Sequence, residues 1–146
     1  MDGARPGFTL IEGLIVVIIL GVLGTLAMPA MERGVMRSRA DRAAFILQND
    51  LRNAFTLASR QRKPVVFAPN SANRSYQILD RETNTVMLHR DLGSRQAFGI
   101  TAISSNPTRV TIFPNGTASG TFTVTLGSGN NIRTISMSRV GHVRVQ

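Results

Sequence analysis

The sequence predicts an α+β fold, in which one long N-terminal helix packs on an antiparallel β-sheet domain. Two patterns predict this fold. As far as residue 63, apolar side chains recur at the three- and four-residue steps of a helix, and from Pro64 onward short β-rich runs alternate with turn residues. The 146 residues contain no internal repeat. Once an apolar N-terminal stretch is set aside, the remaining residues suffice for one small domain.

The first element is an apolar helix, which we place at residues 8–30. From Phe8 to Met28 there are 21 residues with one charged side chain, Glu12. A helix of this length spans roughly 30 Å, the hydrocarbon thickness of a bilayer, so we expect a transmembrane helix. A conventionally cleaved secretory signal is the alternative, with Thr25-Leu26-Ala27 as its cleavage site, although the apolar regions of such signals contain only about 7–15 residues.

Three features of this helix bear on function. A carboxylate such as that of Glu12 costs about 2.5–3.5 kcal/mol at the centre of a membrane-spanning helix and normally marks function. Pro29 removes one backbone hydrogen bond, so we expect a kink or local melting at residues 24–29. Arg5 stands alone before the helix, whereas arginines 33, 37, 39 and 42 follow it, and this distribution by itself favours a cytoplasmic C-terminal domain.

The helix continues through residues 31–63 as an amphipathic element. We expect it to end at residues 60–63, because Pro64 disfavours the helical conformation in the residue before it. Arg60, Arg62 and Lys63 suit the negative end of the helix dipole. The apolar positions share one side of the predicted helix: Met36, Ala40, Ala43, Ala44, Leu47, Leu51, Ala54, Phe55 and Ala58.

Residues 64–146 form the β-rich domain. Turn residues separate its runs, among them Pro69-Asn70, Asn106-Pro107 and the Gly- and Asn-rich residues 127–131. The runs predict eight strands, at residues 65–68, 76–79, 85–89, 98–103, 109–113, 121–126, 132–137 and 142–145.

The composition argues against an enzyme. Cysteine is absent, so the chain has no disulfide, no thiolate nucleophile and no thiolate metal site. No serine lies in a Gly-x-Ser-x-Gly context, and no Gly-rich run follows a strand and opens a helix. His89 and His142 are the only histidines, and we interpret them as surface or sheet residues. We therefore expect no catalysis, no cofactor and no metal.

The charge of the chain is strongly basic. The formal net charge is +9, and Lys63 is the only lysine, so almost all of the basic side chains are arginines. The guanidinium group of arginine forms bidentate hydrogen bonds with phosphates and carboxylates. After Asp91 no acidic side chain occurs, which predicts a basic face on the C-terminal half. A basic surface that only maintains solubility is the alternative. The arginines of this half are Arg95, Arg109, Arg133, Arg139 and Arg144.

The residues Gly7-Phe8-Thr9-Leu10-Ile11-Glu12 resemble the processing site of type IV pilins and type II secretion pseudopilins. The resemblance implies that a prepilin peptidase at the bacterial inner membrane removes the leader, residues 1–7, by cutting between Gly7 and Phe8, and that Phe8 is then N-methylated. It places the domain in the periplasm, against the flanking charges. It also implies that Glu12 pairs with the new N-terminal amine of an adjacent subunit, and that Glu12 and Pro29 act in filament assembly.

Ile112-Phe113-Pro114-Asn115-Gly116 and the following residues 120–124 resemble the corresponding stretch of the GspH/FimT family within that superfamily. This resemblance implies a minor pilin or pseudopilin, a structural subunit of a type II secretion pseudopilus or of a type IV pilus. Its partners would be other pilin or pseudopilin subunits. A membrane-anchored binding domain outside any filament is the alternative if the leader is not cut.

Some FimT-like minor pilins bind DNA during natural transformation, through a C-terminal Gly-Arg-x-Arg motif. The residues here are Gly141-His142-Val143-Arg144, so a histidine that is mostly neutral at pH 7 replaces one arginine. Strand alternation predicts His142 and Arg144 on one face, with Val143 and Val145 packed on the other. Any binding of DNA would be sequence-independent and dependent on salt. The candidate DNA contacts are Arg133, Arg139, His142 and Arg144.

Overall fold

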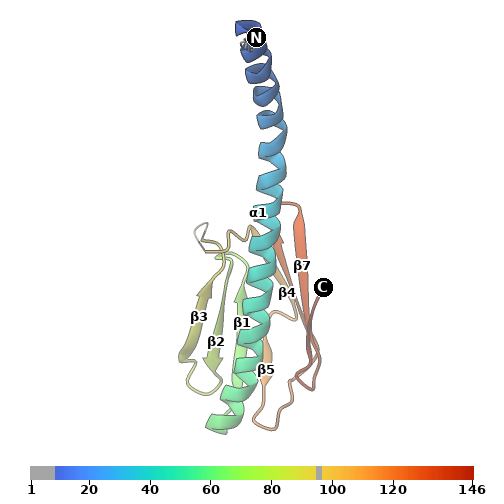
Figure 1. Ribbon diagram of the computed structural model, residues 1–146. Helices are drawn as coiled ribbons and strands as arrows, with labels where there is room; N and C mark the ends of the chain where they lie inside the picture. Colours follow the sequence, from blue (N-terminus) through green and yellow to red (C-terminus); the bar gives the residue numbers. More distant parts are fainter. Residues whose placement is uncertain (1–8, 95–96) are drawn as a thin grey trace, which may run out of the picture. The chain divides into compact units, whose positions relative to one another are not determined.

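The computed structural model describes residues 9–94 and 97–146, with only the backbone described for residues 26–30. The chain divides into a first unit that ends at Val35 and a second unit, Met36–Gln146. Helix α1 (Leu10–Gln61) runs through both units, and all strands belong to the second (Figure 1). The strands are β1 (Val65–Asn70), β2 (Ser75–Asp80), β3 (Val86–Asp91), β4 (Ala102–Asn106), β5 (Val110–Ile112), β6 (Phe122–Ser128), β7 (Asn131–Met137) and β8 (Val143–Val145).

In the first unit, α1 begins at a hydrogen-bonded cap. The Thr9 hydroxyl oxygen accepts a hydrogen bond from the backbone N–H of Glu12 at 3.3 Å, and the Thr9 carbonyl accepts one from the N–H of Gly13 at 3.2 Å. Thr-x-x-Glu is a sequence signature of this type of helix start. The backbone is then helical without a break, so of the kink or local melting expected at residues 24–29, the local melting is wrong. A proline removes only one bond of the helical ladder, and the turns on either side keep theirs.

The end of α1 is confirmed. Gln61 is the last helical residue, and Arg62 adopts a φ of 55°, the left-handed conformation that commonly follows a helix. The N–H of Arg62 donates to the carbonyl of Ser59 at 3.4 Å. Pro64 follows, and β1 begins at the next residue.

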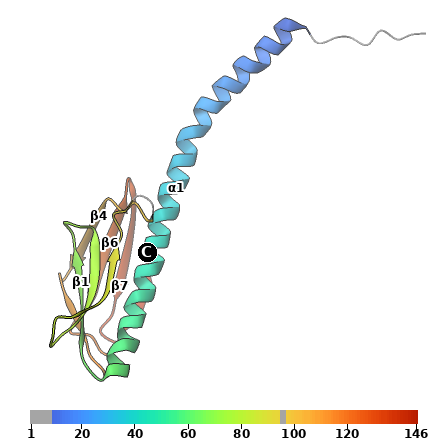
Figure 2. The ribbon, with the colours of Figure 1, turned by 90° about the vertical axis from the view of Figure 1, so that its left-hand side faces the viewer.

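In the second unit, the helix lies against one side of two four-stranded antiparallel sheets, so the predicted α+β class is confirmed (Figure 2). The first sheet has the order β3-β2-β1-β5 and the second has the order β4-β6-β7-β8. The sequence predicted the antiparallel arrangement but not the division into two sheets. The division arises because β5 pairs with β1, whereas its sequence neighbours β4 and β6 pair with each other.

One hydrophobic core joins the helix to both sheets. Leu47 and Leu51 of α1 are fully buried in it, among small alanines that let the helix approach the strands closely. The Phe67 ring of β1 lies 5.3 Å from the Tyr76 ring of β2 and 5.2 Å from the Phe122 ring of β6. Aromatic contacts of this kind add about 0.5–1.5 kcal/mol each beyond the area they bury. The contact between Phe67 and Phe122 therefore stabilises the junction between the two sheets, whereas that between Phe67 and Tyr76 lies within the first sheet.

All eight predicted strands are present, and β4 is the one whose position differs most from the prediction. Residues 98–103 were expected to be extended, but the carbonyl of Ser94 accepts hydrogen bonds from the N–H groups of Ala97, Phe98 and Gly99, which form a turn. Gly99 has a φ of 59°, which favours glycine. The strand is instead Ala102–Asn106, whose polar end resembles a loop in sequence and is held by pairing with β6.

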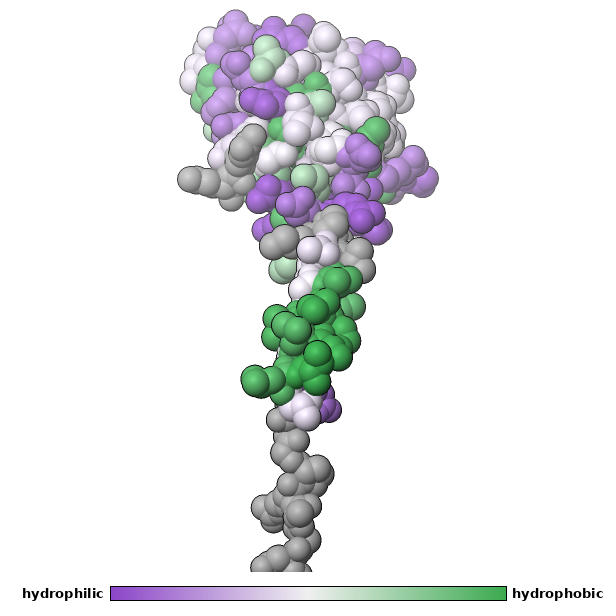
Figure 3. Space-filling view, turned by 90° about the horizontal axis from the view of Figure 1, so that it is seen from above, coloured by the Kyte–Doolittle hydropathy of each residue, from purple (hydrophilic) through white to green (hydrophobic). Residues whose placement is uncertain are grey.

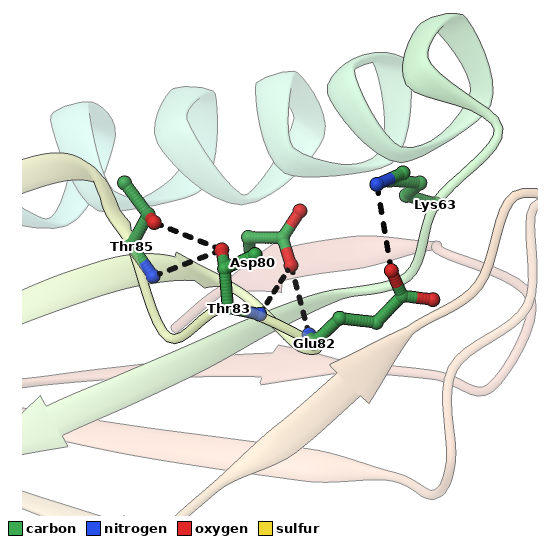
Figure 4. A network of polar contacts seen from close by, with 5 residues as sticks. All are labelled: Lys63, Asp80, Glu82, Thr83 and Thr85. Carbon is green, nitrogen blue, oxygen red and sulfur yellow. Dashed lines mark hydrogen bonds and ion pairs between the residues drawn. The ribbon is translucent and has the colours of Figure 1, made fainter.

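The turn between β2 and β3 is built around Asp80 (Figure 4). Its Oδ1 accepts hydrogen bonds from the N–H groups of Glu82 at 2.8 Å and Thr83 at 3.0 Å. These bonds, that of Thr83 first, lower the pKa of the Asp80 carboxyl because they stabilise its charged form. Lys63, just after α1, pairs with Glu82 at 3.4 Å, but this pair is exposed and adds little stability.

Candidate functional site

The first unit presents an apolar helical surface, visible in Figure 3. Glu12 is exposed and lies in the first turn of α1, where the positive end of the helix dipole stabilises a carboxylate. It is the only ionisable residue among residues 10–25. The exposed large apolar side chains of this stretch are Leu10, Ile11, Leu14, Ile15, Val16, Val17, Ile18, Ile19, Leu20, Val22 and Leu23.

Among the residues that the structure describes, no helix is long and apolar enough to cross a membrane.

The predicted cleavage residues, Gly7 and Phe8, lie outside the described residues, as does the side chain of Pro29. Their assignments therefore stay predictions from the sequence.

At the other end of the chain, a tight turn places the candidate DNA-binding strand. Gly141 has a φ of 77°, and a Cβ at this position would lie 3.1 Å from the Phe55 ring. Only glycine fits both requirements. The N–H of His142 donates to the Ser138 hydroxyl at 3.1 Å, and the N–H of Ser138 donates to the carbonyl of His142 at 2.9 Å. These bonds fix where β8 begins.

His142 and Arg144 lie together, as the alternation of the strand predicted. Both are exposed, and Arg144 Nε donates to His142 Nε2 at 3.0 Å. Val143 is buried, and its carbonyl accepts a hydrogen bond from the side-chain amide of Gln48 on α1 at 3.2 Å. Val145 differs from the prediction, because it is 38% exposed at the end of the chain and not fully packed.

Arg133 does not join this pair. Ser136 of β7 lies opposite Arg144, so alternation puts Arg133 on the other face of the sheet, together with buried Ile135. There the Arg133 guanidinium forms an ion pair with Asp41 of α1. Its charge is therefore offset within the unit, and its side chain faces α1 and not the surface of Arg144.

Arg139 is exposed in the turn between β7 and β8. Its carbonyl accepts a hydrogen bond from the N–H of Ala118 at 2.7 Å. The side chain lines a hollow on one side of this turn, whereas His142 and Arg144 line a second hollow. The structure thus brings Arg139 near the same turn as His142 and Arg144 but into a separate depression.

The hollow at His142 and Arg144 has a volume of about 370 Å³. The other residues that line it are Thr121, Phe122, Thr123, Ser136, Met137 and Ser138. No acidic residue follows Asp91 in the chain, so this surface combines positive charge with neutral hydrogen-bond donors. Such a surface is suited to anionic groups. In the described part of the chain, no three His, Asp or Glu side chains come together as metal ligands do.

A buried polar cluster at Asp50 was missed by the sequence analysis. Asp50 of α1 is 4% exposed, and its Oδ2 accepts hydrogen bonds from the Tyr76 hydroxyl at 2.6 Å and from Nε and an Nη atom of Arg90 at 3.0 and 2.9 Å. Burial raises the pKa of the Tyr76 phenol above its usual range, and the bond to Asp50 adds to the effect. The signal was present, since Asp50 falls on the apolar side of the helix beside Leu47 and Leu51.

The comparisons with known proteins agree with this architecture. A family model described as type II transport protein GspH matches residues 43–141. No protein of curated function matches the chain. Two crystal structures of the type IV minor pilin FimU of Pseudomonas aeruginosa are 17% identical to it, with TM-scores of 0.57 and 0.59, and cover 73% and 75% of this chain and 91% and 90% of their own.

The minor pseudopilin EpsH from the type 2 secretion system of Vibrio cholerae is 10% identical, with a TM-score of 0.53 over 74% of this chain and 96% of EpsH. At these identities the solved structures establish the fold. The family model spans more than half of the residues. The protein therefore belongs to the GspH family of type IV pilin-like proteins.

Proposed function

We propose that the protein is a minor subunit of a type II secretion pseudopilus or of a type IV pilus, and that its first unit joins a bundle of subunit helices. The apolar surface of α1 carries this proposal. Eleven large apolar side chains of residues 10–23 are exposed. Burying one such side chain yields about 1.5–3 kcal/mol, so a surface of this size needs an apolar partner.

In this proposal the apolar surface of the first unit is buried in two successive environments. Before assembly, the lipid of the inner membrane covers the apolar residues and the second unit lies in the periplasm. After assembly, the helices of neighbouring pilin or pseudopilin subunits replace the lipid. The second unit needs no such cover, because it buries its own core of residues between Ala40 and Val143.

Processing supplies the partner for Glu12. A prepilin peptidase cuts between Gly7 and Phe8, and the amine of Phe8, once methylated, pairs with the Glu12 carboxylate of the adjacent subunit. The exposure of Glu12 supports this step, because its side chain is available to a neighbour while its N–H is engaged by Thr9. An ion pair in an apolar bundle is favourable only when both charges are present.

The mass of the mature protein tests the proposal. When the chain is co-produced with a prepilin peptidase, we expect the purified membrane fraction to contain a protein that begins at Phe8 and carries one N-methyl group. A peptidase with an inactivated active site is the control and should leave Met1 in place. A protein that starts after Ala27, or that keeps Met1 beside active peptidase, would contradict the proposal.

DNA binding is a second candidate function, favoured by the exposed pair of His142 and Arg144 on an acid-free surface. Arg139 adds positive charge at the same turn. We expect weak, sequence-independent binding in which phosphates contact the guanidinium groups. In a salt titration, Arg144→Ala should weaken binding and reduce the slope of log affinity against log salt by about 1.

Arg60→Ala is the matched control, because Arg60 is an exposed arginine in the last turn of α1 and lines a hollow with Ile78 and Leu88 of the first sheet. It should leave the affinity for DNA close to that of the unchanged protein. Absence of binding at low salt, or equal effects of the two substitutions, would reject DNA binding without affecting the filament proposal.

A further inference from the structure

One end of the second unit, where its part of α1 begins, carries a group of arginines that neither function above uses. We call this group the basic end. Figure 3 looks onto this end of the unit and shows hydrophilic side chains gathered beside the helix. The members of the basic end are Arg37, Arg39 and Arg42 of α1 and Arg74 of the turn between β1 and β2.

Loops from both sheets place Arg74 at the same end as the helix arginines. The N–H of Leu92 donates to the carbonyl of Arg74, and the N–H of Ile100 donates to the carbonyl of Leu92, each at 2.9 Å. Gly99 precedes Ile100, and a Cβ on Gly99 would lie 3.2 Å from Nη1 of Arg39. Arg74 and Arg39 therefore lie at the same end of the domain, and Arg37 and Arg42 lie within one turn of Arg39 on α1.

The basic end carries more positive than negative charge. Among the described residues, none of its arginines forms an ion pair. Of the acidic side chains nearby, Asp41 is paired with Arg133, whereas Asp91 accepts a hydrogen bond from the N–H of Gly93 at 2.8 Å and keeps its negative charge. A surplus of positive charge remains at this surface.

An apolar side chain is exposed at the same end. Ile132 of β7 is 61% exposed. It lies opposite Gly127 of β6, which lies opposite Ala102 of β4, so the three residues form one cross-strand row of the second sheet. This row lies beside the turn between β6 and β7, where a Cβ on Gly129 would lie 3.0 Å from the sulfur of Met36. Because Ile132 alternates with Arg133, its side chain lies on the face of the second sheet away from α1, so the isoleucine and the arginines share this end of the unit but not one face. Positive charge and an exposed apolar side chain at one end are the combination that binds the boundary between headgroups and acyl chains.

We propose that the basic end binds anionic phospholipid headgroups, with Ile132 in contact with the acyl boundary. The proposal rests on the membrane anchoring in the proposed function, because Arg37 follows the apolar stretch of the first unit along the same helix. Guanidinium groups bind phosphate in a forked geometry. Nucleic acid would use the same arginines, but it offers no apolar phase for the isoleucine.

With this assignment, the arginines that follow the apolar helix bind lipid and do not determine the orientation of the helix in the membrane. On the periplasmic side they contact lipid phosphates directly. The positive charges that favour a cytoplasmic domain by simple counting are then compatible with an exported one.

Site-directed labelling tests the proposal in the full-length protein. The chain has no cysteine, so Ile132→Cys carries a single environment-sensitive fluorophore. Asn115→Cys is the matched control, because Asn115 lies next to Pro114, whose carbonyl binds the Ser59 hydroxyl near the other end of α1. Each labelled protein is reconstituted into vesicles of phosphatidylcholine alone or of phosphatidylcholine with phosphatidylglycerol.

We expect the label at position 132 to shift to the blue and to lose its quenching by iodide only on vesicles with phosphatidylglycerol. The label at position 115 should not change. The double substitution Arg39→Gln and Arg42→Gln should reverse the protection at position 132, as should about 1 M salt, at which charges are screened beyond roughly 3 Å. If the label at position 132 stays protected from iodide in high salt or on neutral vesicles, the basic end does not recognise the headgroups by their charge.

Flotation separates this inference from the function on which it rests. If the protein floats with the vesicles while iodide still quenches the label at position 132, the proposed headgroup contact is wrong and the proposed membrane anchoring is unaffected. If the protein floats with neither type of vesicle, the headgroup contact and the membrane anchoring are both wrong. Protection of the label by duplex DNA, without protection by phosphatidylglycerol, would assign the basic end to nucleic acid instead.

Discussion

Asp50→Ala is expected to lower the free energy of unfolding by about 3 kcal/mol, the lower end of the cost of removing one partner from a buried ion pair. The substitution leaves the Tyr76 hydroxyl buried without its acceptor and Arg90 without its counter-ion. The lower end applies because Arg90 exposes 35% of its side chain and can turn toward water. Thermal and chemical unfolding followed by circular dichroism measure the change.

Two further variants test whether the loss of stability comes from the buried cluster at Asp50. Tyr76→Phe removes one hydrogen bond and keeps the ion pair, so it should cost about 1 kcal/mol. Asn49→Ala alters the exposed neighbour of Asp50 on the same helix and should stay within about 0.5 kcal/mol. If Asp50→Ala is no more destabilising than Asn49→Ala, the cluster does not stabilise the contact between α1 and the first sheet.

Glu12→Ala is expected to abolish incorporation of the protein into the filament while leaving it in the membrane. In the proposed assembly the substitution removes the counter-charge of the N-terminal amine of a neighbour, which then remains uncompensated among apolar helices. Breaking a buried pair in this way costs about 3–5 kcal/mol, which lowers the association constant by more than about 100-fold. Co-purification with sheared filaments measures incorporation, and the membrane fraction measures anchoring.

Glu32→Gln provides the matched control, because Glu32 is an exposed carboxylate of the same helix that lies outside the apolar stretch. It should assemble as the unchanged protein does. Normal incorporation of Glu12→Ala would show that the carboxylate serves the start of α1, through the helix dipole and the cap at Thr9, and not the contact between subunits.

The candidate sites differ in how far the sequence predicts them. The pairing of His142 with Arg144 follows from strand alternation, which is a local property, and the structure confirms it. The grouping of Arg133 with them is not supported, because Arg133 belongs to the opposite face and contacts Asp41, 92 residues earlier. The cleavage site at Gly7 and Phe8 and the roles of Glu12 and Pro29 stay predictions.

The sequence by itself determined the elements of this protein. Apolar residues spaced three and four positions apart predict the helix, and Pro64 marks its end. The turn residues then separate the eight strands. Each of these signals acts within a few residues of the chain. Only the tertiary structure decided how these elements pair. The division into two sheets, the bond of Asp50 to Arg90 40 residues away and the arginines of the basic end depend on register between distant segments. A shift of one residue in that register would turn every side chain of a strand to the other face, so no local pattern reveals it.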